Sequence, residues 1–319
     1  MRMTELRYKK SICIFILSSF SFLLYAQDQC LNRNYMSNGL YNINPAAAGF
    51  DGAFISELTG YKKWMGLNGS PAGQVLSNSL KLGSEGFYDP DMFLNRPFFN
   101  IAPRVGIGFT IFNESSGPLR HTGLLLAYAY HIPIKENHLS FGLSGLITQH
   151  YVNTREFKAV NEGDAALYSN ATLFVPNLNF GVMFYNRKLF IGMAVDGLLN
   201  YNSQLYDTKT SPDIVFFGGN KFIINQNFTF EPSTFLWKYE DGTISLGINS
   251  KLYYSDKNWA LVSYTNKREI LAGIGITIKS GIQLNYIYTT STAGLSTYSL
   301  GKQSISIRVD ITTLVRKQK

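Results

Sequence analysis

The chain has 319 residues, of which 16% are charged and 14% aromatic, and its formal net charge is +8. Soluble globular domains carry about 25% charged residues, so this composition is more typical of apolar surface spread thinly over many strands. No Lys/Arg cluster indicates a nucleic-acid partner, and long polar disorder is excluded by the aromatic content.

The first 26 residues are predicted to be a signal peptide. A basic start, MRMTELRYKK, is followed by a 16-residue apolar run that ends at Ala26. The run is shorter than the roughly 20 residues that a spanning helix needs, which favours cleavage near Ala26 over a retained anchor. Cleavage leaves 25 basic and 20 acidic residues, a net charge of +5. Cys13 leaves with the signal, so Cys30 then has no cysteine to pair with.

Residues 27–50 form a separate N-terminal segment that contains the stretch YNINPAAAGF. Pro45 fixes its own backbone angle, lacks an amide donor and biases Asn44 toward extended geometry, so the stretch is unsuited to a sheet interior. The three alanines and Gly49 let the backbone pass close to a wall. We expect residues 35–50 to lie against such a wall; a flexible leader is the alternative.

From residue 51 onward the chain alternates apolar and polar residues with the period of a strand. In HLSFGLSGLITQHYV, for example, Leu139, Phe141 and Leu143 fall on one face and Ser140, Gly142 and Ser144 on the other. About fourteen such segments are predicted: 51–61, 72–83, 103–114, 121–133, 138–150, 175–185, 188–199, 221–231, 233–240, 243–255, 257–266, 268–279, 281–290 and 303–315.

The connections between these segments are predicted to be short on one side and long on the other. IKEN, YNRK, EPS, SDKN and KSG are the short ones, whereas 151–174, 200–220 and 290–302 are long. Transmembrane barrels of the outer membrane have short periplasmic turns, longer external loops and an even strand number that leaves both termini periplasmic. The segment 84–103 breaks the rule, and we interpret it as a plug or docking loop, or as a missed pair of strands.

Together these features predict an all-β fold: an antiparallel transmembrane β-barrel over residues 51–319, with both termini periplasmic and residues 35–50 in its periplasmic mouth. In lipid every backbone polar group must be bonded within the protein, so a sheet that spans the membrane must close. A barrel of this size is too wide for side chains alone to fill. Charges on the polar face, which fit either a wet channel or a salt-bridge network, are Asp196, Lys251, Glu269, Lys279, Arg308 and Asp310.

Aromatic residues near the strand ends are expected to form the interfacial girdles of such a barrel. The residues concerned are Tyr128, Tyr130, Tyr151, Tyr185, Trp237, Tyr239, Tyr253, Tyr254, Trp259, Tyr286 and Tyr288. An aromatic core of a soluble β protein is the alternative interpretation, since aromatic residues favour strands in general.

No pattern predicts catalysis, a cofactor or a metal. Phosphate loops, HExxH and GxSxG are absent. Ser144 and His150 share a face but lie about 20 Å apart along one strand, at roughly 3.3 Å per residue, too far for proton transfer. Asp89 and Asp91 lack the glycine that a calcium loop needs, which favours a solvated turn.

The front of the chain resembles the PorP/SprF family, outer-membrane proteins of the Bacteroidetes type IX secretion system. The resemblance rests on an Asn-Pro-Ala segment followed by Gly, a Trp with Gly and then Gly-x-Pro, a loop Gly, a YAY strand and LSxGL. The matching positions are Asn44, Pro45, Ala46 and Gly49; Trp64, Gly66, Gly69 and Pro71; Asn113 and Gly117; Tyr128 and Tyr130; and Leu139, Ser140, Gly142 and Leu143.

The resemblance implies a non-enzymatic protein of the bacterial outer membrane. Its implied partners are outer-membrane lipid, a large secreted or surface-anchored cargo protein and the periplasmic components of the secretion system. The residues alone leave a second possibility open, a passive channel or transporter for small solutes, which requires an open bore.

Overall fold

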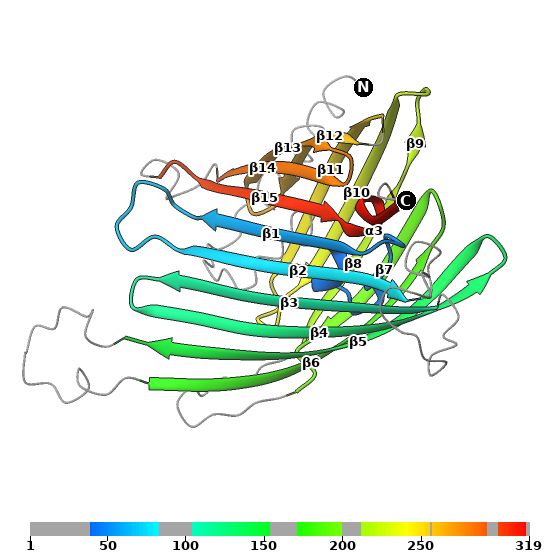
Figure 1. Cartoon of the computed structure of the whole chain (residues 1–319). Coiled ribbons are helices and arrows are strands. Elements are labelled where there is room, and N and C mark those ends of the chain that lie inside the picture. Colours follow the sequence, from blue (N-terminus) through cyan, green and yellow to red (C-terminus); the bar gives the residue numbers. More distant parts are fainter. Residues whose placement is uncertain are drawn as a thin grey trace, which may run out of the picture. The chain divides into compact units, whose positions relative to one another are not determined.

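The computed structural model describes residues 39–82, 104–153, 171–199, 212–255, 257–291 and 299–316. The predicted signal peptide, Cys30 and the segment 84–103 with Asp89 and Asp91 lie outside these ranges. Within them the chain forms one antiparallel sheet (Figure 1). Its strands are β1 (Ile55–Lys62), β2 (Ala72–Leu82), β3 (Val105–Ser116), β4 (Leu119–Ile134), β5 (Asn137–Val152), β6 (Ala171–Tyr185), β7 (Leu189–Asp196), β8 (Asp213–Asn220), β9 (Phe222–Ile223), β10 (Phe228–Lys238), β11 (Ile244–Tyr254), β12 (Asn258–Thr265), β13 (Glu269–Lys279), β14 (Ile282–Ser291) and β15 (Lys302–Asp310).

The sheet closes into a barrel, as predicted. Apart from β8 and β9, strands that are neighbours in sequence pair with each other, and β1 also pairs with β15 over its whole length, from Ile55 opposite Asp310 to Lys62 opposite Gln303. β8 and β9 are separated by Lys221 alone and both pair with β10, so they form one interrupted strand. The fifteen strands of the sheet therefore make a barrel of fourteen.

One end of the barrel carries five short turns, at 135–136, 186–188, 224–227, 255–257 and 280–281, and is called the short-turn end below. β1 begins and β15 ends there. The opposite end carries long connections at 153–170, 197–212 and 292–301 but also short ones at 117–118, 239–243 and 266–268. The two ends of the barrel therefore differ less in loop length than predicted.

The predicted loop 200–220 and the predicted eighth strand 221–231 are wrong: residues 213–220 form β8, and residues 224–227 form a turn. The boundary predicted between the eighth and ninth strands is wrong as well. Glu231, Pro232 and Ser233 were expected to form a turn, but they lie inside β10. Pro232 fits there because the pairing of β10 to its other neighbour is interrupted between Phe230 and Ser233, so its missing amide breaks no ladder bond. The turn is made instead by Asn225, whose side chain accepts hydrogen bonds from the backbone amides of Asn227 and Phe228.

The last strand is also shorter than predicted. It ends at Asp310 and is followed by a one-and-a-half-turn helix, α3 (Ile311–Arg316), instead of continuing to residue 315. The carboxylate of Asp310 accepts hydrogen bonds from the amide and the hydroxyl of Thr313, at 3.0 and 2.7 Å. An acidic residue that bonds the first turn of a helix favours helix over strand at this point.

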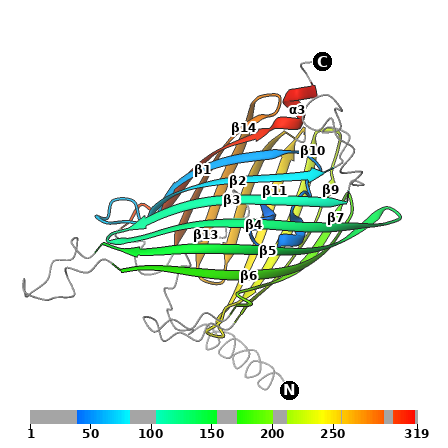
Figure 2. The ribbon, with the colours of Figure 1, turned by 60° about the horizontal axis from the view of Figure 1, so that its bottom comes forward.

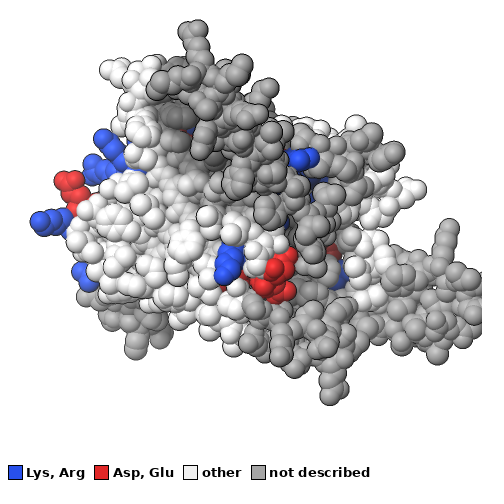
Figure 3. Space-filling view, turned by 180° about the vertical axis from the view of Figure 1, so that it is seen from behind, with Lys and Arg blue, Asp and Glu red and all other residues white. Residues whose placement is uncertain are grey.

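The outer surface of the barrel is apolar. Side chains that are more than half exposed on this surface include Leu58, Leu126, Ile147, Ile191, Val262 and Ile305. On the face that Figure 3 shows, charged side chains are few and a broad uncharged surface separates them. Such a surface needs an apolar surrounding, which a bilayer provides.

The expected aromatic girdle is only partly present. Tyr128, Tyr130 and Tyr286 lie on the outer face, but Tyr185, Trp237 and Trp259 are buried inside the barrel. The prediction for these three is wrong because their side chains lie on the inner faces of their strands. Tyr185, for example, lies on the same face of β6 as the buried Met183. Inside, they supply the bulk that a wide bore requires. None of the helices in the described ranges is long and apolar enough to cross a membrane.

The outward face of β4 allows a test of how deep its residues lie in the membrane. Leu126 lies mid-strand and is 54% exposed, whereas Ile134 lies on the same face at the strand end and is 47% exposed. Leu126→Arg is expected to lower the free energy of unfolding in lipid vesicles by about 2–4 kcal/mol, and Ile134→Arg by about 0–1 kcal/mol, because the cost of a charge depends on depth. Equal losses, measured by urea titration, would contradict the proposed depth of these residues.

Candidate functional site in the bore

Residues 39–54, which run through the inside of the barrel to the start of β1, are called the plug (in blue in Figure 2); residues 41 and 43–49 of it are buried. Two short 3₁₀ helices, η1 (Leu40–Asn42) and η2 (Pro45–Ala47), shape it. Asn44 is extended and its side chain accepts the amide proton of Ala46 at 2.9 Å, so Asn44 caps η2 while Pro45 occupies the first helical position. Asn44, Ala46 and Ala48 are fully buried. The small residues therefore do lie against a wall.

The wall that faces the plug is a groove of glycines on β3, β5, β6 and β7. A Cβ atom on Gly106 would lie 1.8 Å from the carbonyl oxygen of Ala48, and one on Gly142 would lie 2.2 Å from the nitrogen of Ala46. On Gly181 it would lie 1.9 Å from the side-chain oxygen of Asn44. No other residue type fits these positions while the plug is seated.

The plug contributes a glycine of its own to the same contact. Gly49 has a φ of +72°, a conformation that residues with a side chain rarely adopt. A Cβ on Gly49 would lie 2.9 Å from the Cα of Gly106. Two backbones therefore approach each other at this point with no side chain between them.

Hydrogen bonds to the wall satisfy the buried polar groups of the plug. The side-chain amide of Asn44 donates to the carbonyl of Val182 on β6 and to that of Met193 on β7, at 3.0 and 3.2 Å. Ser140 on β5 donates to the carbonyl of Ala46 at 2.7 Å. A buried polar group without a partner costs about 1–3 kcal/mol, so these bonds stabilise the plug in its buried position.

His131 on β4 links the plug to the wall through both ring nitrogens. Its Nε2 lies 2.8 Å from the carbonyl oxygen of Ala48, and its Nδ1 lies 2.9 Å from the hydroxyl of Tyr185. A carbonyl only accepts, so Nε2 carries the proton and Nδ1 accepts from the Tyr185 hydroxyl. The imidazole is neutral and fully bonded, with neither nitrogen left over for proton transfer.

Tyr41 holds the N-terminal end of the plug against β3. Its hydroxyl donates to the carbonyl of Phe109 at 3.0 Å and lies 2.7 Å from the hydroxyl of Thr110. Thr110 in turn donates to the side chain of Asn42 at 2.7 Å. Burial raises the pKa of the Tyr41 hydroxyl to about 12.

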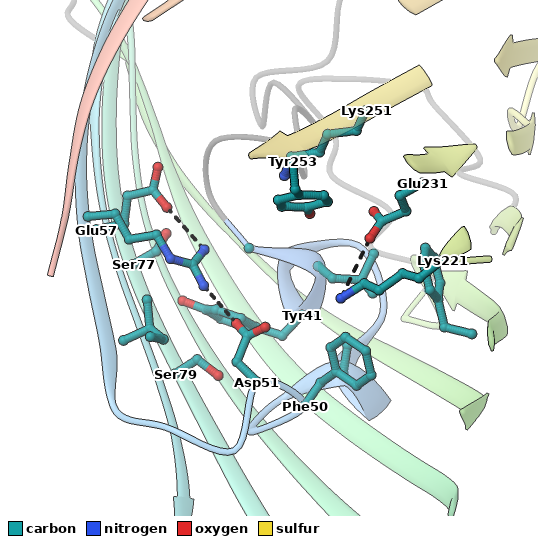
Figure 4. Close-up of a pocket in the computed structure, with 16 residues that line it drawn as sticks. Tyr41, Phe50, Asp51, Glu57, Ser77, Ser79, Lys221, Glu231, Lys251 and Tyr253 are labelled. Atoms are coloured by element: carbon teal, nitrogen blue, oxygen red, sulfur yellow. Dashed lines mark hydrogen bonds and ion pairs between the residues drawn. The ribbon is translucent and has the colours of Figure 1, made fainter. Parts of the chain in front are cut away.

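A cavity of about 150 Å³ separates the plug from the opposite wall (Figure 4). Tyr41, Ala47 and Phe50 line it from the plug side. Among the residues that line it from the barrel wall, five are charged and one is a tyrosine: Glu57, Lys221, Glu231, Lys251, Arg308 and Tyr253. The sixth charged residue, Asp51, comes from the plug.

Two ion-pair groups occupy this cavity. Arg308 on β15 contacts Asp51 at 3.0 Å and Glu57 at 3.8 Å, and so connects the plug to the closing pair of strands. Lys221 contacts Glu231 at 3.6 Å. These pairs and the cavity between them lie on the side of the plug away from the glycine groove.

The charges predicted for the bore do not gather in one place. Lys251 and Arg308 line the cavity, and Asp196 is buried at the end of β7. Glu269 and Lys279 lie at the two ends of β13 and are exposed, while Asp310 caps α3.

Ser140 and Gly142 of the LSxGL motif contact the plug, whereas a second group of motif residues lies apart from it. Trp64, Gly66, Gly69 and Pro71 belong to the connection between β1 and β2, at the end opposite the short turns. Trp64, Gly66 and Gly69 all have positive φ angles, and the amide of Gly117 donates to the carbonyl of Gly69 at 3.0 Å. This motif therefore shapes a loop, whereas Asn44, Pro45, Ala46 and Gly49 belong to the plug.

Sequence reasoning did not find the partners of the plug, among them Gly106, Gly181 and His131. The available signal was weak: small residues on the inward face of several consecutive strands. Small inward residues also fit a water-filled bore, so the pattern by itself does not indicate a contact.

A closed fourteen-stranded barrel with an apolar exterior and its own N-terminal segment in the bore defines an outer-membrane β-barrel protein. The chain belongs to a particular family of them: residues 24–309 match the family described as type IX secretion system membrane protein PorP/SprF. The family resemblance and the outer-membrane location expected from the sequence are thereby confirmed.

Several solved structures are similar to this chain at low identity. The CymD monoaromatic hydrocarbon channel is 10% identical, with 90% of this chain and 94% of that chain covered and a TM-score of 0.49. The outer membrane protein Omp33 of Acinetobacter baumannii is 9% identical, with coverages of 80% and 95% and a TM-score of 0.46. A Pseudomonas aeruginosa FadL homologue is 11% identical, with coverages of 84% and 92% and a TM-score of 0.42. No protein of curated function matches the sequence.

The glycine groove predicts a selective effect of added side chains. Gly142→Val should displace the plug, because a Cβ at this position overlaps Ala46, while the barrel still closes. Gly145→Val is the matched control on the same strand, since a Cβ there meets nothing within 4 Å. Limited proteolysis of the folded barrels should cleave within residues 39–54 at least about tenfold faster in Gly142→Val than in the control. Equal cleavage rates would contradict the seating of the plug.

Tyr41 predicts how the plug responds to high pH. The docked state holds the pKa of Tyr41 at about 12, above its ordinary value of 10.0, so docking stability is fully present below pH 10 and is lost as the pH rises towards 12. Proteolysis of the plug should accelerate over this window in the wild type. In Tyr41→Phe the baseline rate should be higher, because the bond to Thr110 is lost, but its rise with pH should be smaller. Identical pH profiles would show that Tyr41 is not buried as described.

Proposed function

We propose that this protein is a non-catalytic barrel of the type IX secretion machinery that assists the secretion or surface anchoring of a large cargo protein and contacts periplasmic components. The observation that carries the proposal is the plug. A bore occupied by the protein's own buried residues suits an anchor or scaffold better than a diffusion pathway. Family membership supports the same assignment.

In this proposal the short-turn end faces the periplasm. The support is the general rule that outer-membrane barrels have short periplasmic turns and periplasmic termini, together with the start of β1 and the end of β15 at the short-turn end. The plug would then occupy the bore on its periplasmic side. The plug and the short turns would form the surface that periplasmic components meet.

The absence of catalysis is part of the proposal. His131 lies opposite Ser140 on the neighbouring strand, but both side chains are bonded to plug carbonyls. A general base needs a free nitrogen within reach of its substrate. These bonds support a structural role for both residues.

The second candidate function is a passive channel for small solutes, and conductance separates the two. In planar bilayers the wild-type barrel should show no stable open steps, because the plug occupies the bore. Gly142→Val should show steps of open-pore size, and Gly145→Val should behave as the wild type. Stable conductance of the wild type equal to that of Gly142→Val would favour the channel.

Co-purification tests whether the barrel binds the proposed partner proteins. Mild detergent extraction of the tagged barrel from its own cells should recover a periplasmic secretion component or a large surface protein together with it. Recovery of the barrel alone, with the conductance remaining closed, would contradict the anchoring role.

A further inference from the structure

The cavity beside the plug contains an excess positive charge in one half. The ammonium groups of Lys251 and Lys221 lie 4.8 and 5.8 Å from the ring centroid of Tyr253. The only carboxylate of this half is that of Glu231, which contacts Lys221 at 3.6 Å. Two cations therefore face one anion.

Among the described residues of the cavity, Lys251 is the cation that makes no ion pair at contact distance, because Glu231 opposite it contacts Lys221 instead. Its ammonium lies 4.8 Å from the ring centroid of Tyr253 and 4.6 Å from that of Trp259, so aromatic faces hold it. Cation–π contacts contribute about 0.5–2 kcal/mol and leave the hydrogen-bond donors of an ammonium unused. Lys251 thus presents donors and a positive charge to the cavity.

The other half of the cavity has the opposite balance. Arg308 faces two carboxylates, Asp51 at 3.0 Å and Glu57 at 3.8 Å. Glu57 also accepts a hydrogen bond from Ser306 at 2.6 Å. A ligand with two negative charges would be repelled from this side, whereas a single negative charge fits the excess at Lys251 and Lys221.

We propose that the cavity binds a small organic carboxylate, with the carboxylate group between the ammonium groups of Lys251 and Lys221. Charge-assisted hydrogen bonds to a carboxylate are among the strongest polar contacts that an ammonium makes. Tyr41 and Phe50 line the same cavity and would contact the apolar part of the ligand. The volume of about 150 Å³ is half of the roughly 300 Å³ at which pockets for drug-sized ligands begin, so the ligand is small.

Calorimetric titration of the purified full-length barrel in detergent tests this site, with acetate, benzoate and inorganic phosphate as probes at constant ionic strength. Benzoate should bind most tightly and phosphate most weakly, because the site combines one excess charge with apolar side chains. Lys251→Met should weaken benzoate binding by at least about tenfold. Lys267→Met is the matched control, because its ammonium lies 4.1 Å from the ring centroid of Tyr239 outside the cavity; it should bind benzoate as the wild type does.

A second variant keeps the test valid if Lys251→Met fails to fold. Lys221→Met removes the cation that forms an ion pair with Glu231. Glu231 then becomes free to pair with Lys251, its direct neighbour on the adjacent strand. Benzoate binding should again fall by at least about tenfold. The proposal is overturned if the wild type binds none of the probes, if phosphate binds more tightly than benzoate, or if Lys251→Met and Lys267→Met lose binding equally. It does not depend on the secretion role, since the cargo plays no part in the titration.

Discussion

The fold depends on closure of the sheet between β1 and β15. A strand in lipid has no water to bond its edge, so an open sheet is not viable there, and the eight residue pairs from Ile55–Asp310 to Lys62–Gln303 remove that edge. Closure at fourteen strands creates a bore that wall side chains alone do not fill. The plug and the inward aromatic residues follow from that geometry, because the space near the short-turn end has to be occupied or left to water.

The plug and the wall are fitted to each other at the level of the backbone. A glycine within a strand costs roughly 0.5–1 kcal/mol relative to alanine, yet Gly106, Gly142 and Gly181 lie where the plug passes. The contact recovers this cost through buried bonds from Asn44, Ser140 and His131. Because these partners come from β4 to β7 while Asp51 bonds to β15, the plug can seat fully only on a closed barrel.

The period of two along the chain was enough to predict most of the strands, because inner and outer faces differ in polarity over nearly every segment, but it missed β8. It failed at Pro232, where a break in the opposite ladder made proline acceptable. It also failed at Tyr185, Trp237 and Trp259, since a wide bore accepts aromatic residues as readily as an interface does. The small residues from Ala46 to Gly49 indicated a wall, but the wall itself is assembled from strands distant in sequence. The pairing of Arg308 with Asp51 spans 257 residues, and no local pattern contains it.

The plug is held in the assembled barrel with Ala46 against the inner face of β5. Disulfide formation between Ala46→Cys and Ser140→Cys, in a Cys30→Ser background, tests it most directly, because the Ser140 hydroxyl lies 2.7 Å from the Ala46 carbonyl. Phe141→Cys, one residue further on the outer face, replaces Ser140→Cys in the control. The structure predicts rapid cross-linking of the first pair in native membranes and none in the control. Absence of cross-linking in both pairs, with the barrel folded, would contradict a seated plug.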